Sequence, residues 1–452
     1  MSPRDPQQQT ERPTRRDFLK TSGVLAGAAL AGNLAVARTA HAAGSDTLKL
    51  GLIGCGNRGT GAARDAMDAD PNVRLVAMGD LFEEKVQTKR KLLQQLKPSQ
   101  VAVDDDHCFV GFDAYQSVID SGVDVVILGE VPHYRPKHLA AAIAAGKHVF
   151  CEKPVAVDAP GVRSVLESTK LAEQKKLSLV SGLCWRYHPA VQETMQRVAD
   201  GEIGQIRNIQ ETYLFGLVGN ITDRRPGMTE MEFQARNWWY FTWLSGDHNV
   251  EQHVHSLDKA LWAMGDEPPV AAWATGGRQV PNFGAKPKTG DTYDHFAVVY
   301  EYPDEVTVNA YCRQQANCYR EVVDRIIGTK GTARIVDAQS QQIFDLDGKR
   351  TWRYRSRARR KPNMYQLEHE ALFKAIRSGE PVNNGQYAAY STMMAIMGRM
   401  CAYTGQRITW EDAINSDESL APSAYSFDAD PPTRPDAEGK YPIAIPGVTK
   451  FA

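Results

Sequence analysis

The sequence predicts an α/β domain followed by an α+β domain with a large, mainly antiparallel open sheet. Two observations support this fold class. From Leu48 to about Ala172, short apolar runs alternate with helix-like stretches, which is the pattern of a parallel sheet built from βαβ units. After about Ser178 the runs grow longer and alternate in polarity, as in an antiparallel sheet with one solvated face.

The elements of the first domain, expected over residues 46–177, follow each other in alternation. Its strands are mostly apolar, as expected where helices cover both faces of a sheet. The predicted strands are 48–53, 74–78, 123–128 and 148–150, and the predicted helices are 59–69, 83–96, 136–145 and 160–172.

The second domain is expected over residues 178–415 and combines polarity-alternating strands with three helices. Beyond it, residues 416–452 are rich in Pro, Asp and Ser without a clear period, which predicts an extended C-terminal tail on the surface. The predicted strands are 206–214, 270–275, 297–302, 306–313 and 332–336, and the predicted helices are 249–264, 364–377 and 387–404.

The first 42 residues have the organisation of an export signal. The pair Arg15–Arg16 precedes an uncharged Ala/Gly-rich run, 21–37, and the small-x-small triplet Ala-His-Ala at 40–42. The run is too short and too rich in Gly and Ala for a membrane span, so we expect no membrane anchor after cleavage. Residues 14–20 resemble the twin-arginine signal, which implies export of a folded protein to the periplasm. Such proteins usually load a cofactor before export.

Composition excludes several classes of protein. The 452 residues carry a formal net charge of −1, and because residues 1–42 hold six basic and three acidic side chains, the remainder is near −4. This balance argues against nucleic acid as a partner. The seven cysteines are scattered without a C-x-x-C pair, so a disulfide framework is not expected.

One basic run leaves two interpretations open. Residues 349–361 hold eight basic side chains, of which Arg353, Arg355, Arg357 and Arg359 repeat at period two. An anionic partner is one interpretation. An edge strand protected by its charge from pairing with other chains is the other.

The first predicted strand runs into a dinucleotide-binding motif, G-x-G-x-x-G, at residues 54–59. Gly54 permits a tight turn, Gly56 lets the pyrophosphate approach the backbone, and Gly59 lets the helix pack on the strand. The phosphates would lie at the helix N-terminus, beside Asn57 and Arg58. The motif in this context predicts a Rossmann domain.

The second predicted strand ends at Asp80, which lies 24 residues after Gly56. An acid near this spacing accepts hydrogen bonds from the ribose hydroxyls and repels a 2′-phosphate. We therefore expect NAD rather than NADP as the cofactor.

Two further stretches follow predicted strands and point toward the ligand crevice. Pro132 and His133 follow the strand 123–128, where a βα loop would approach the nicotinamide end of the cofactor. Glu152 and Lys153 end the strand 148–150, and a charged pair there is costly unless it faces a cleft or a partner. All four residues are candidates for cofactor binding, and Lys153 is also a catalytic candidate.

The glycine motif, Asp80 and the Glu152-Lys153-Pro154 triplet together resemble the Gfo/Idh/MocA oxidoreductase family over nearly the whole mature chain. The resemblance implies that Lys153 lies near the nicotinamide and the substrate hydroxyl. It also implies that His255 takes the hydroxyl proton. The family has an Asp four residues before this histidine, where this chain has Glu251, so Glu251 is expected to orient His255 or to contact substrate.

The helix predicted at 249–264 also allows a metal interpretation. On a continuous helix Glu251 and His255 would share one stripe, and His248 lies close to them in the sequence. His253 would point away from that stripe. We expect general-base chemistry rather than a metal site.

Two segments are candidates for substrate contacts. Trp185, Arg186 and Tyr187 resemble a family segment that lines the substrate pocket, and Trp185 could stack on the C–H face of a sugar. The aromatic stretch 237–243 is either core or, if exposed, a carbohydrate contact.

The sequence thus predicts an NAD-dependent oxidoreductase acting on a hydroxyl of a sugar, cyclitol or glycoside, with a tightly bound, recycled cofactor. A redox-neutral NAD-dependent glycosidase and a non-catalytic sugar-binding protein are the alternatives. We also expect a homo-oligomer, a dimer or tetramer, formed through the sheet of the second domain.

Overall fold

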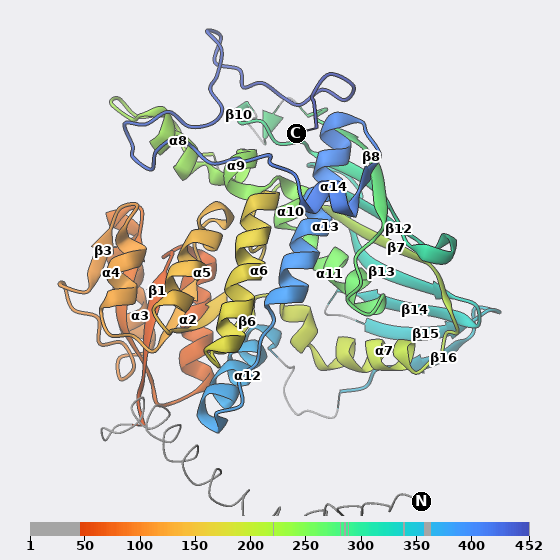
Figure 1. Ribbon diagram of the computed structural model, residues 1–452, viewed down its shortest axis with the longest axis horizontal. Helices are drawn as coiled ribbons and strands as arrows, with labels where there is room; N and C mark the ends of the chain where they lie inside the picture. Colours follow the sequence, from red (N-terminus) through yellow and green to blue (C-terminus); the bar gives the residue numbers. More distant parts are fainter. Residues whose placement is uncertain are drawn as a thin grey trace, which may run out of the picture. The chain divides into compact units, whose positions relative to one another are not determined.

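The computed structural model describes residues 46–219, 221–280, 282–283, 286–287, 289–337, 340–356 and 363–451. The predicted export signal and Arg357 and Arg359 of the basic run lie outside these residues. Leu48–Ala452 form one compact unit. Two sheets with helices between them build this unit (Figure 1).

The first sheet has six parallel strands in the order β3-β2-β1-β4-β5-β6. The order reverses between β1 and β4, which is where open α/β sheets bind ligands. The strands are β1 (Leu48–Ile53), β2 (Val73–Asp80), β3 (Cys108–Val110), β4 (Val125–Leu128), β5 (His148–Cys151) and β6 (Leu179–Ser181).

Helices cover both faces of this sheet, which explains its apolar strands. Alternate residues of β4 point to opposite sides: Val125 and Ile127 join a core with α2 and α3, whereas Val126 and Leu128 join a core with α4, α5 and α6. The helices are α2 (Asn57–Ala69), α3 (Glu83–Leu96), α4 (Ala114–Asp120), α5 (Arg135–Ala144) and α6 (Ala159–Gln174), with a 3-10 turn, η1 (Pro132–Tyr134), before α5.

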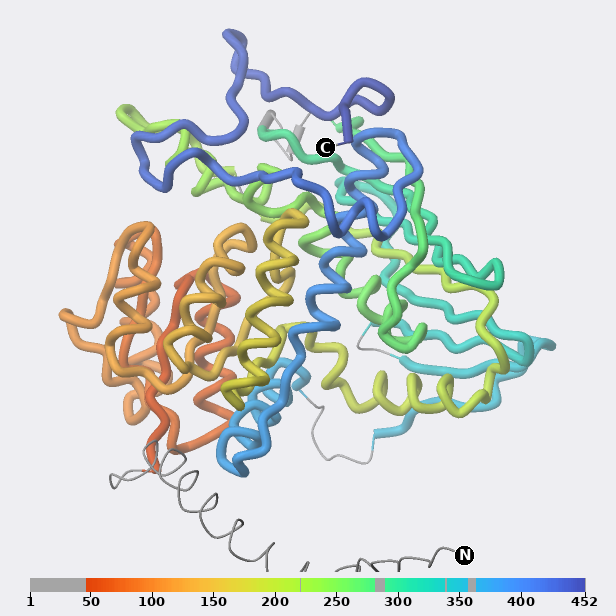
Figure 2. The backbone as a smooth tube through the Cα atoms, in the orientation of Figure 1, coloured from red at the N-terminus to blue at the C-terminus, as the bar shows by residue number. Residues whose placement is uncertain are grey.

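A late segment of the chain returns to this layer (Figure 2). Helix α12 (Met364–Ser378) packs on α2, and residues after it extend the sheet edge, since Leu179 donates to the carbonyl oxygen of Val382 at 2.8 Å. The layer of the parallel sheet therefore includes two elements from beyond residue 177, where the first predicted domain ends. These elements are strand β6 and helix α12.

The second sheet has nine strands in the order β16-β15-β14-β13-β7-β12-β11-β8-β17. All neighbours are antiparallel except β7 and β12, so the expected α/β plus mainly antiparallel α+β fold class is confirmed. The strands are β7 (Ile206–Phe215), β8 (Ala271–Gly277), β11 (His295–Glu301), β12 (Thr307–Gln314), β13 (Glu321–Gly328), β14 (Gly331–Val336), β15 (Ser340–Asp345), β16 (Arg350–Arg353) and β17 (Ile408–Thr409), and a separate hairpin joins β9 (Asn282–Phe283) to β10 (Lys286–Pro287).

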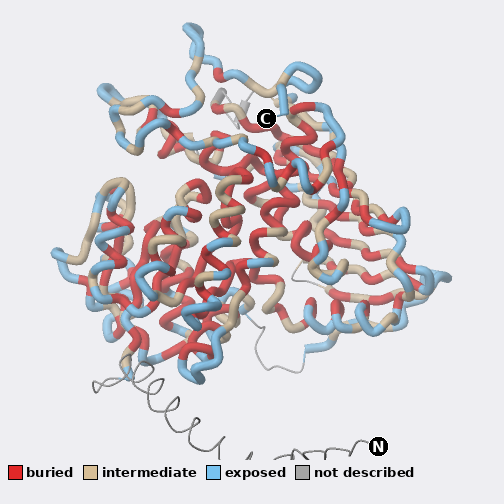
Figure 3. The backbone as a smooth tube through the Cα atoms, in the orientation of Figure 1, coloured by how far each residue is buried: buried red, intermediate tan, exposed pale blue. Residues whose placement is uncertain are grey.

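One face of the second sheet packs on helices and the other is partly exposed (Figure 3). On β11, Phe296, Val298 and Tyr300 are buried while the residues between them are half-buried. The remaining helices are α7 (Pro189–Ala199), α8 (Glu230–Arg236), α9 (Thr242–Ser245), α10 (His248–Glu251), α11 (Val254–Ala263), α13 (Gly385–Thr404) and α14 (Trp410–Ile414), with 3-10 turns η2 (Cys184–Tyr187), η3 (Trp238–Tyr240) and η4 (Pro303–Glu305).

Three features of the second part differ from or refine the expectations. The helix predicted at 249–264 is divided, because α10 ends at Glu251 and α11 begins at Val254. Part of the basic run forms β16, the outermost strand of its sheet, which favours the edge-strand interpretation. Residues 416–451 form no helix or strand and run past α9 and α8 (Figure 1).

Candidate active site

A cavity of about 670 Å³ lies at the carboxyl ends of the first sheet. Every strand of that sheet contributes to its wall through a residue at its end or just beyond it. These residues are Gly54, Asp80, Gly111, Gly129, Glu152 and Gly182. The opposite wall comes from the second part of the chain, with residues of β7, η3, α10 and α11. The cavity therefore has a dinucleotide end, defined by the turn after β1, and a substrate end, defined by Lys153 and α10.

The glycine turn meets the steric demands predicted for it. Gly54 has φ +90°, and a Cβ on it would lie 2.2 Å from the backbone nitrogen of Glu130. A Cβ on Gly59 would lie 2.0 Å from the carbonyl oxygen of Gly54. At Gly56, by contrast, a Cβ would meet nothing within 4 Å, so this position borders open space. The fold therefore requires glycine at positions 54 and 59, whereas Gly56 leaves room for a ligand.

The open space at Gly56 lies at the start of α2. Gly56 is the N-cap residue and no side chain caps this helix end, which leaves backbone N–H groups for an anion. Asn57 and Arg58 line the cavity at the same point. The turn fits a bound pyrophosphate.

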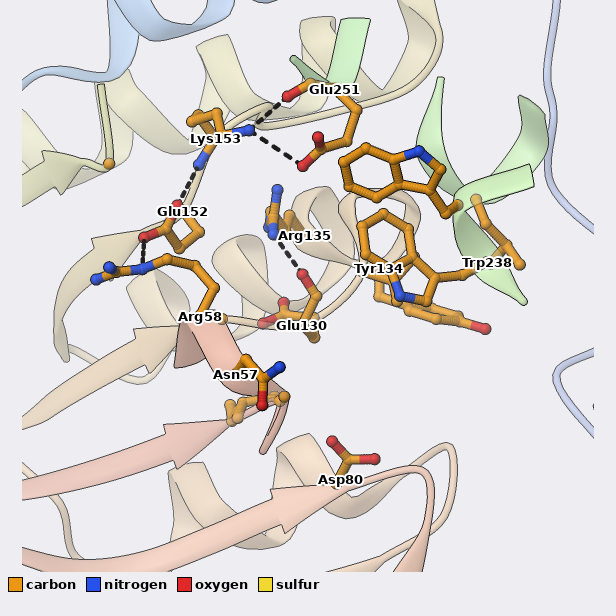
Figure 4. A pocket seen from close by; sticks show the side chains of 18 of the residues that line it. Asn57, Arg58, Asp80, Glu130, Tyr134, Arg135, Glu152, Lys153, Trp238 and Glu251 are labelled. Atoms are coloured by element: carbon orange, nitrogen blue, oxygen red, sulfur yellow. Dashed lines mark hydrogen bonds and ion pairs between the residues drawn. The ribbon is translucent and has the colours of Figure 1, made fainter. Parts of the chain in front are cut away.

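Asp80 lies at the end of β2 in the same wall (Figure 4). Its carboxylate accepts hydrogen bonds from the backbone nitrogens of Cys55 at 2.7 Å and Phe82 at 3.0 Å. Burial raises the pKa of Asp80, although the nearby Lys85 acts in the opposite direction. The two backbone bonds fix the carboxylate beside the glycine turn, as expected for a ribose-binding acid.

Glu152 links the end of β5 to the glycine turn. Its carboxylate forms an ion pair with Arg58, Nε to Oε1 at 2.7 Å, and accepts from the backbone nitrogen of Lys153 at 3.2 Å. A Cβ on Gly182 would lie 2.7 Å from Oε2 of Glu152, so β6 approaches this carboxylate closely. Glu152 and Arg58 thus hold Lys153 at a fixed place relative to α2.

Lys153 makes the central contact of the substrate end (Figure 4). Its ammonium donates to the side chain of Glu251, Nζ to Oε1 at 3.1 Å, and to the main-chain carbonyl oxygen of the same residue. Both side chains are about nine-tenths buried. Glu251 therefore contacts Lys153, whereas orientation of His255 or contact with substrate was expected.

The contact with Lys153 also explains why the predicted helix is divided. In a continuous helix the carbonyl oxygen of Glu251 would accept from the backbone nitrogen of His255. Here the ammonium of Lys153 donates to that oxygen. The backbone nitrogen of His255 donates instead to the carbonyl oxygen of Gln252 at 3.3 Å. The single continuous helix predicted at 249–264 is therefore wrong, whereas Glu251 and His255 line the same cavity.

His255 lines the cavity together with Lys153 and Glu251. Its ring nitrogen Nδ1 is buried without a hydrogen-bond partner among the described residues. Burial, reinforced by Lys153, Lys259 and Arg58, holds the pKa of His255 well below its usual range. The imidazole is therefore neutral at pH 7 and can accept a proton.

The predicted substrate residues 185–187 do not all line the cavity. Trp185 lines the cavity. Arg186 instead forms ion pairs with Asp258 and Asp266, and Tyr187 donates to Asn384 at 2.6 Å.

Near η1, His133 contacts the C-terminal tail. Its Nε2 lies 2.9 Å from the hydroxyl of Tyr425, and burial lowers its pKa to about 4. Pro132 beside it is buried at the start of η1. Both residues lie behind the wall formed by Val131 and Tyr134, which do line the cavity.

The structure adds cavity residues that the sequence did not single out. Tyr213, Gln252 and Asp337 line the substrate end, and the hydroxyl of Tyr213 donates to Gln252 at 2.9 Å. The aromatic stretch 237–243 is divided between cavity and core, because Trp238 and Trp239 line the cavity while Trp243 is core. Tyr213 on β7 gave no signal beyond the polarity alternation of its strand.

Two kinds of site are absent from the described residues. No group of three or more His, Cys, Asp or Glu side chains is placed to hold a metal ion. No helix in the described part of the chain is long and apolar enough to cross a membrane.

Comparison with known proteins gives matches over most of the chain. The model of an oxidoreductase family with an NAD-binding Rossmann fold matches residues 48–182, and the model of the GFO/IDH/MocA C-terminal domain matches residues 191–334. The model of the twin-arginine translocation signal matches residues 12–32, so the chain carries this signal.

Curated relatives are inositol dehydrogenases at low identity. Inositol 2-dehydrogenase of Rhizobium meliloti is 25% identical over 222 residues, which is 49% of this chain and 56% of the relative. Inositol 2-dehydrogenase of Acidothermus cellulolyticus is 23% identical over 293 residues, 65% of this chain and 74% of the relative. The chain spans about half the length of the first of these relatives.

Solved structures share the fold. Aldose-aldose oxidoreductase of Caulobacter crescentus has a TM-score of 0.62 at 21% identity and covers 80% of this chain and 99% of its own. A levoglucosan dehydrogenase in complex with NADH and L-sorbose has a TM-score of 0.64 at 17% identity and covers 80% of this chain and 98% of its own. With both domain models matched and the glycine turn, Asp80 and Lys153 gathered at one cavity, the chain belongs to the Gfo/Idh/MocA oxidoreductase family, and NAD is its cofactor.

Proposed function

We propose that this protein is an NAD-dependent oxidoreductase that oxidises a hydroxyl group of a sugar, cyclitol or glycoside. The observation that carries the proposal is the cavity itself. One wall holds the glycine turn at Gly54 and the carboxylate of Asp80, and the other end holds Lys153 beside the neutral His255. The relatives described as inositol 2-dehydrogenases support this class of substrate.

The residues of the substrate end supply the proton chemistry. NAD, when bound, accepts the hydride removed from the carbon that carries the hydroxyl. His255, neutral because it is buried, accepts the hydroxyl proton as a general base. The ammonium of Lys153 stabilises the negative charge that develops on the substrate oxygen.

Glu251 has a positioning role in this scheme. Its two contacts to Lys153 fix the ammonium, and its Oε2 accepts from Gln252 at 2.7 Å. Arg58 and Glu152 support the same lysine from the side of α2. The lysine is held by two elements before any substrate enters.

Aromatic residues favour a carbohydrate or cyclitol over a small acid. Trp185, Trp238, Trp239 and Tyr213 all line the cavity. Ring faces of this kind pack on the C–H faces of cyclic polyols, while Gln252 and Asp337 offer hydrogen bonds to hydroxyls.

Export bears on the fate of the cofactor. The twin-arginine signal carries folded proteins, so the proposed location is the periplasm and the dinucleotide would be loaded in the cytoplasm. Free NAD is scarce outside the cytoplasm, and a released NADH could not readily be replaced. We therefore propose a tightly held cofactor that is restored within each catalytic cycle.

A recycled cofactor allows a second candidate reaction. A transient oxidation followed by cleavage of a glycosidic bond and return of the hydride would leave the cofactor unchanged. The twin-arginine signal favours this redox-neutral glycosidase as the alternative, because such an enzyme needs no external electron acceptor.

The test starts with the exported protein purified under native conditions. Mass spectrometry of a denatured extract identifies bound NAD, and incubation with inositols, aldoses and glycosides follows NADH absorbance and product formation. Oxidised product that requires a second sugar as acceptor supports the oxidoreductase, whereas free reducing sugar without net NADH supports the glycosidase. Absence of NAD from the denatured extract together with no NAD binding on titration would refute both, and NAD binding without turnover would indicate a sugar-binding protein.

A further inference from the structure

The dinucleotide end of the cavity is walled by aromatic rings from the loops after β2, β3 and β4. Phe82 lies two residues after Asp80, the last residue of β2, while Phe112 follows β3 and Tyr134 ends η1, and all three line the cavity. In a Rossmann domain the acid at the end of the second strand marks the adenosine ribose. Phe82 and Phe112 are therefore the walls nearest to the adenosine half of NAD.

Residues of the C-terminal tail pack against the outer side of these rings. Phe427 stacks on Phe82 with ring centroids 5.8 Å apart and lies 5.2 Å from Phe112. Tyr425 lies 5.9 Å from Tyr134, and its hydroxyl is 2.9 Å from Nε2 of His133. Two aromatic residues of the tail thus support three rings of the cavity wall.

The tail is anchored to the first layer on one side of these contacts. Arg163 on α6 donates to the carbonyl oxygens of Ile414 at 2.7 Å and Ser416 at 2.8 Å. The backbone nitrogen of Leu420 donates to Oδ2 of Asp158, the N-cap residue of α6, at 2.9 Å. These bonds fix the start of the tail beside α6.

Beyond Phe427 the tail is anchored to α8, which belongs to the second part of the chain. Gln234 donates to the carbonyl oxygen of Thr433 at 2.7 Å, and the hydroxyl of Tyr441 donates to Glu230 at 2.6 Å. The tail therefore reaches from α6 across the aromatic wall to α8 (Figure 1).

Helix α8 adds a direct connection to the same wall. Arg236 forms an ion pair with Glu84 on α3 at 2.5 Å, and its guanidinium lies 3.9 Å from the ring centroid of Phe82. Phe82 is thus packed by Arg236 as well as by Phe427. Release of a ligand past Phe82 would have to disturb both contacts.

We propose that the tail segment 416–441 is part of the dinucleotide site and slows the release of NAD by holding the aromatic wall over its adenosine half. This inference rests on the proposed function, because it takes NAD as the ligand. It gives a structural basis for a cofactor that stays bound after export. In this arrangement Tyr425 and Phe427 are positioning residues, since they act through Phe82, Phe112 and Tyr134.

The experiment measures NAD release from the full-length purified protein. Holoprotein is mixed with an excess of an NAD-hydrolysing enzyme, and the bound NAD that remains is quantified over time in denatured samples. Loss of the Phe427 ring contacts in F427A is expected to speed release about tenfold, and Y425F, which loses only the hydroxyl contact to His133, about threefold. Thermal unfolding is recorded for each variant.

Phe451 offers a matched control in the same tail, since this residue is 37% exposed. F451A is expected to release NAD at the wild-type rate. If F427A does not fold, F427L replaces it, and a release rate within twofold of wild type in the folded variant would overturn the proposal. A wild-type protein that never binds NAD would instead refute the proposed function, so the two failures are distinguishable.

Discussion

The two ends of the cavity are built in different ways. The dinucleotide end comes largely from one short stretch, residues 54–59, together with Asp80 at the end of the neighbouring strand. The substrate end joins Lys153 after β5 to Glu251 on α10, 98 positions along the chain. Backbone requirements of the glycine turn determine where the phosphates would lie, whereas a long-range side-chain contact determines the position of Lys153.

This difference has a consequence for variants. A change at the dinucleotide end acts on backbone geometry or on cofactor affinity, and a change at the substrate end acts on turnover.

The largest effect is expected at the substrate end, from Lys153→Met. Loss of the ammonium removes the group that stabilises the developing charge, so kcat should fall about a thousandfold while NAD affinity changes little. Steady-state kinetics and NAD titration measure the two quantities. Lys85→Met is the matched control, because Lys85 lines the dinucleotide end beside Asp80 and should alter NAD affinity rather than kcat. A kcat for Lys153→Met within tenfold of wild type would contradict the role assigned to Lys153.

The next effect separates two glycines of the same turn. Gly54→Ala introduces a Cβ at φ +90° and 2.2 Å from the nitrogen of Glu130, and should cost about 4 kcal/mol of unfolding free energy. The Cβ that Gly56→Ala adds meets no atom within 4 Å. This variant should therefore keep its stability and bind NAD about tenfold more weakly. Denaturant unfolding and NAD titration of both variants check this. Unchanged NAD affinity in Gly56→Ala would show that the open space at Gly56 has no relation to this ligand.

These two predictions also indicate how far the sequence alone could go. Strand β1 and helix α3 begin and end at the predicted residues, because periodicity and the glycine turn are local signals. The division of the helix at Glu251 was not predictable, since it depends on Lys153 taking a carbonyl oxygen from another part of the fold. Strand β13 was missed as well. Its Asp324 is buried only because Lys259 on α11 pairs with it.

The same reasoning applies to the predicted site residues. Glycines and Asp80 reach the cavity because strand ends of a parallel sheet converge there. The resemblance placed Arg186 at the substrate pocket, and the sequence left Trp238 open between core and cavity, since the direction of each side chain depends on which acid or helix lies opposite. The role of each predicted site residue, and the homo-oligomer expected through the second sheet, remain predictions.

A third prediction concerns a residue behind the substrate end. Arg186→Gln leaves Asp258, whose side chain is 1% exposed, without its cation, and should cost about 3 kcal/mol of unfolding free energy. The KM for substrate should not change in the folded variant. Trp185→Phe next to it provides the comparison, because Trp185 lines the cavity and its substitution should raise KM without a comparable loss of stability. A raised KM for Arg186→Gln at wild-type stability would place Arg186 in the substrate site instead.

The smallest effect tests how the environment of His255 sets its pKa. Lys259 pairs with Asp324 behind Trp185, both about 2% exposed, and after burial and Lys153 it is the next cause that lowers the pKa of His255. The double variant Lys259→Met, Asp324→Asn removes the buried pair without leaving either charge alone. Because a general base acts in its neutral form, kcat/KM declines as pH falls through the pKa of His255.

Removal of the Lys259 cation raises the pKa of His255, so the acid decline of kcat/KM should move to higher pH. The acid limb of the pH profile of kcat/KM measures the shift, and NAD affinity over the same pH range serves as the comparison with the dinucleotide end. The opposite direction, a decline that moves to lower pH, would mean that the essential base is a group other than His255. A shift in NAD affinity of equal size would mean that the buried pair acts on the whole cavity, which would remove the distinction between its two ends.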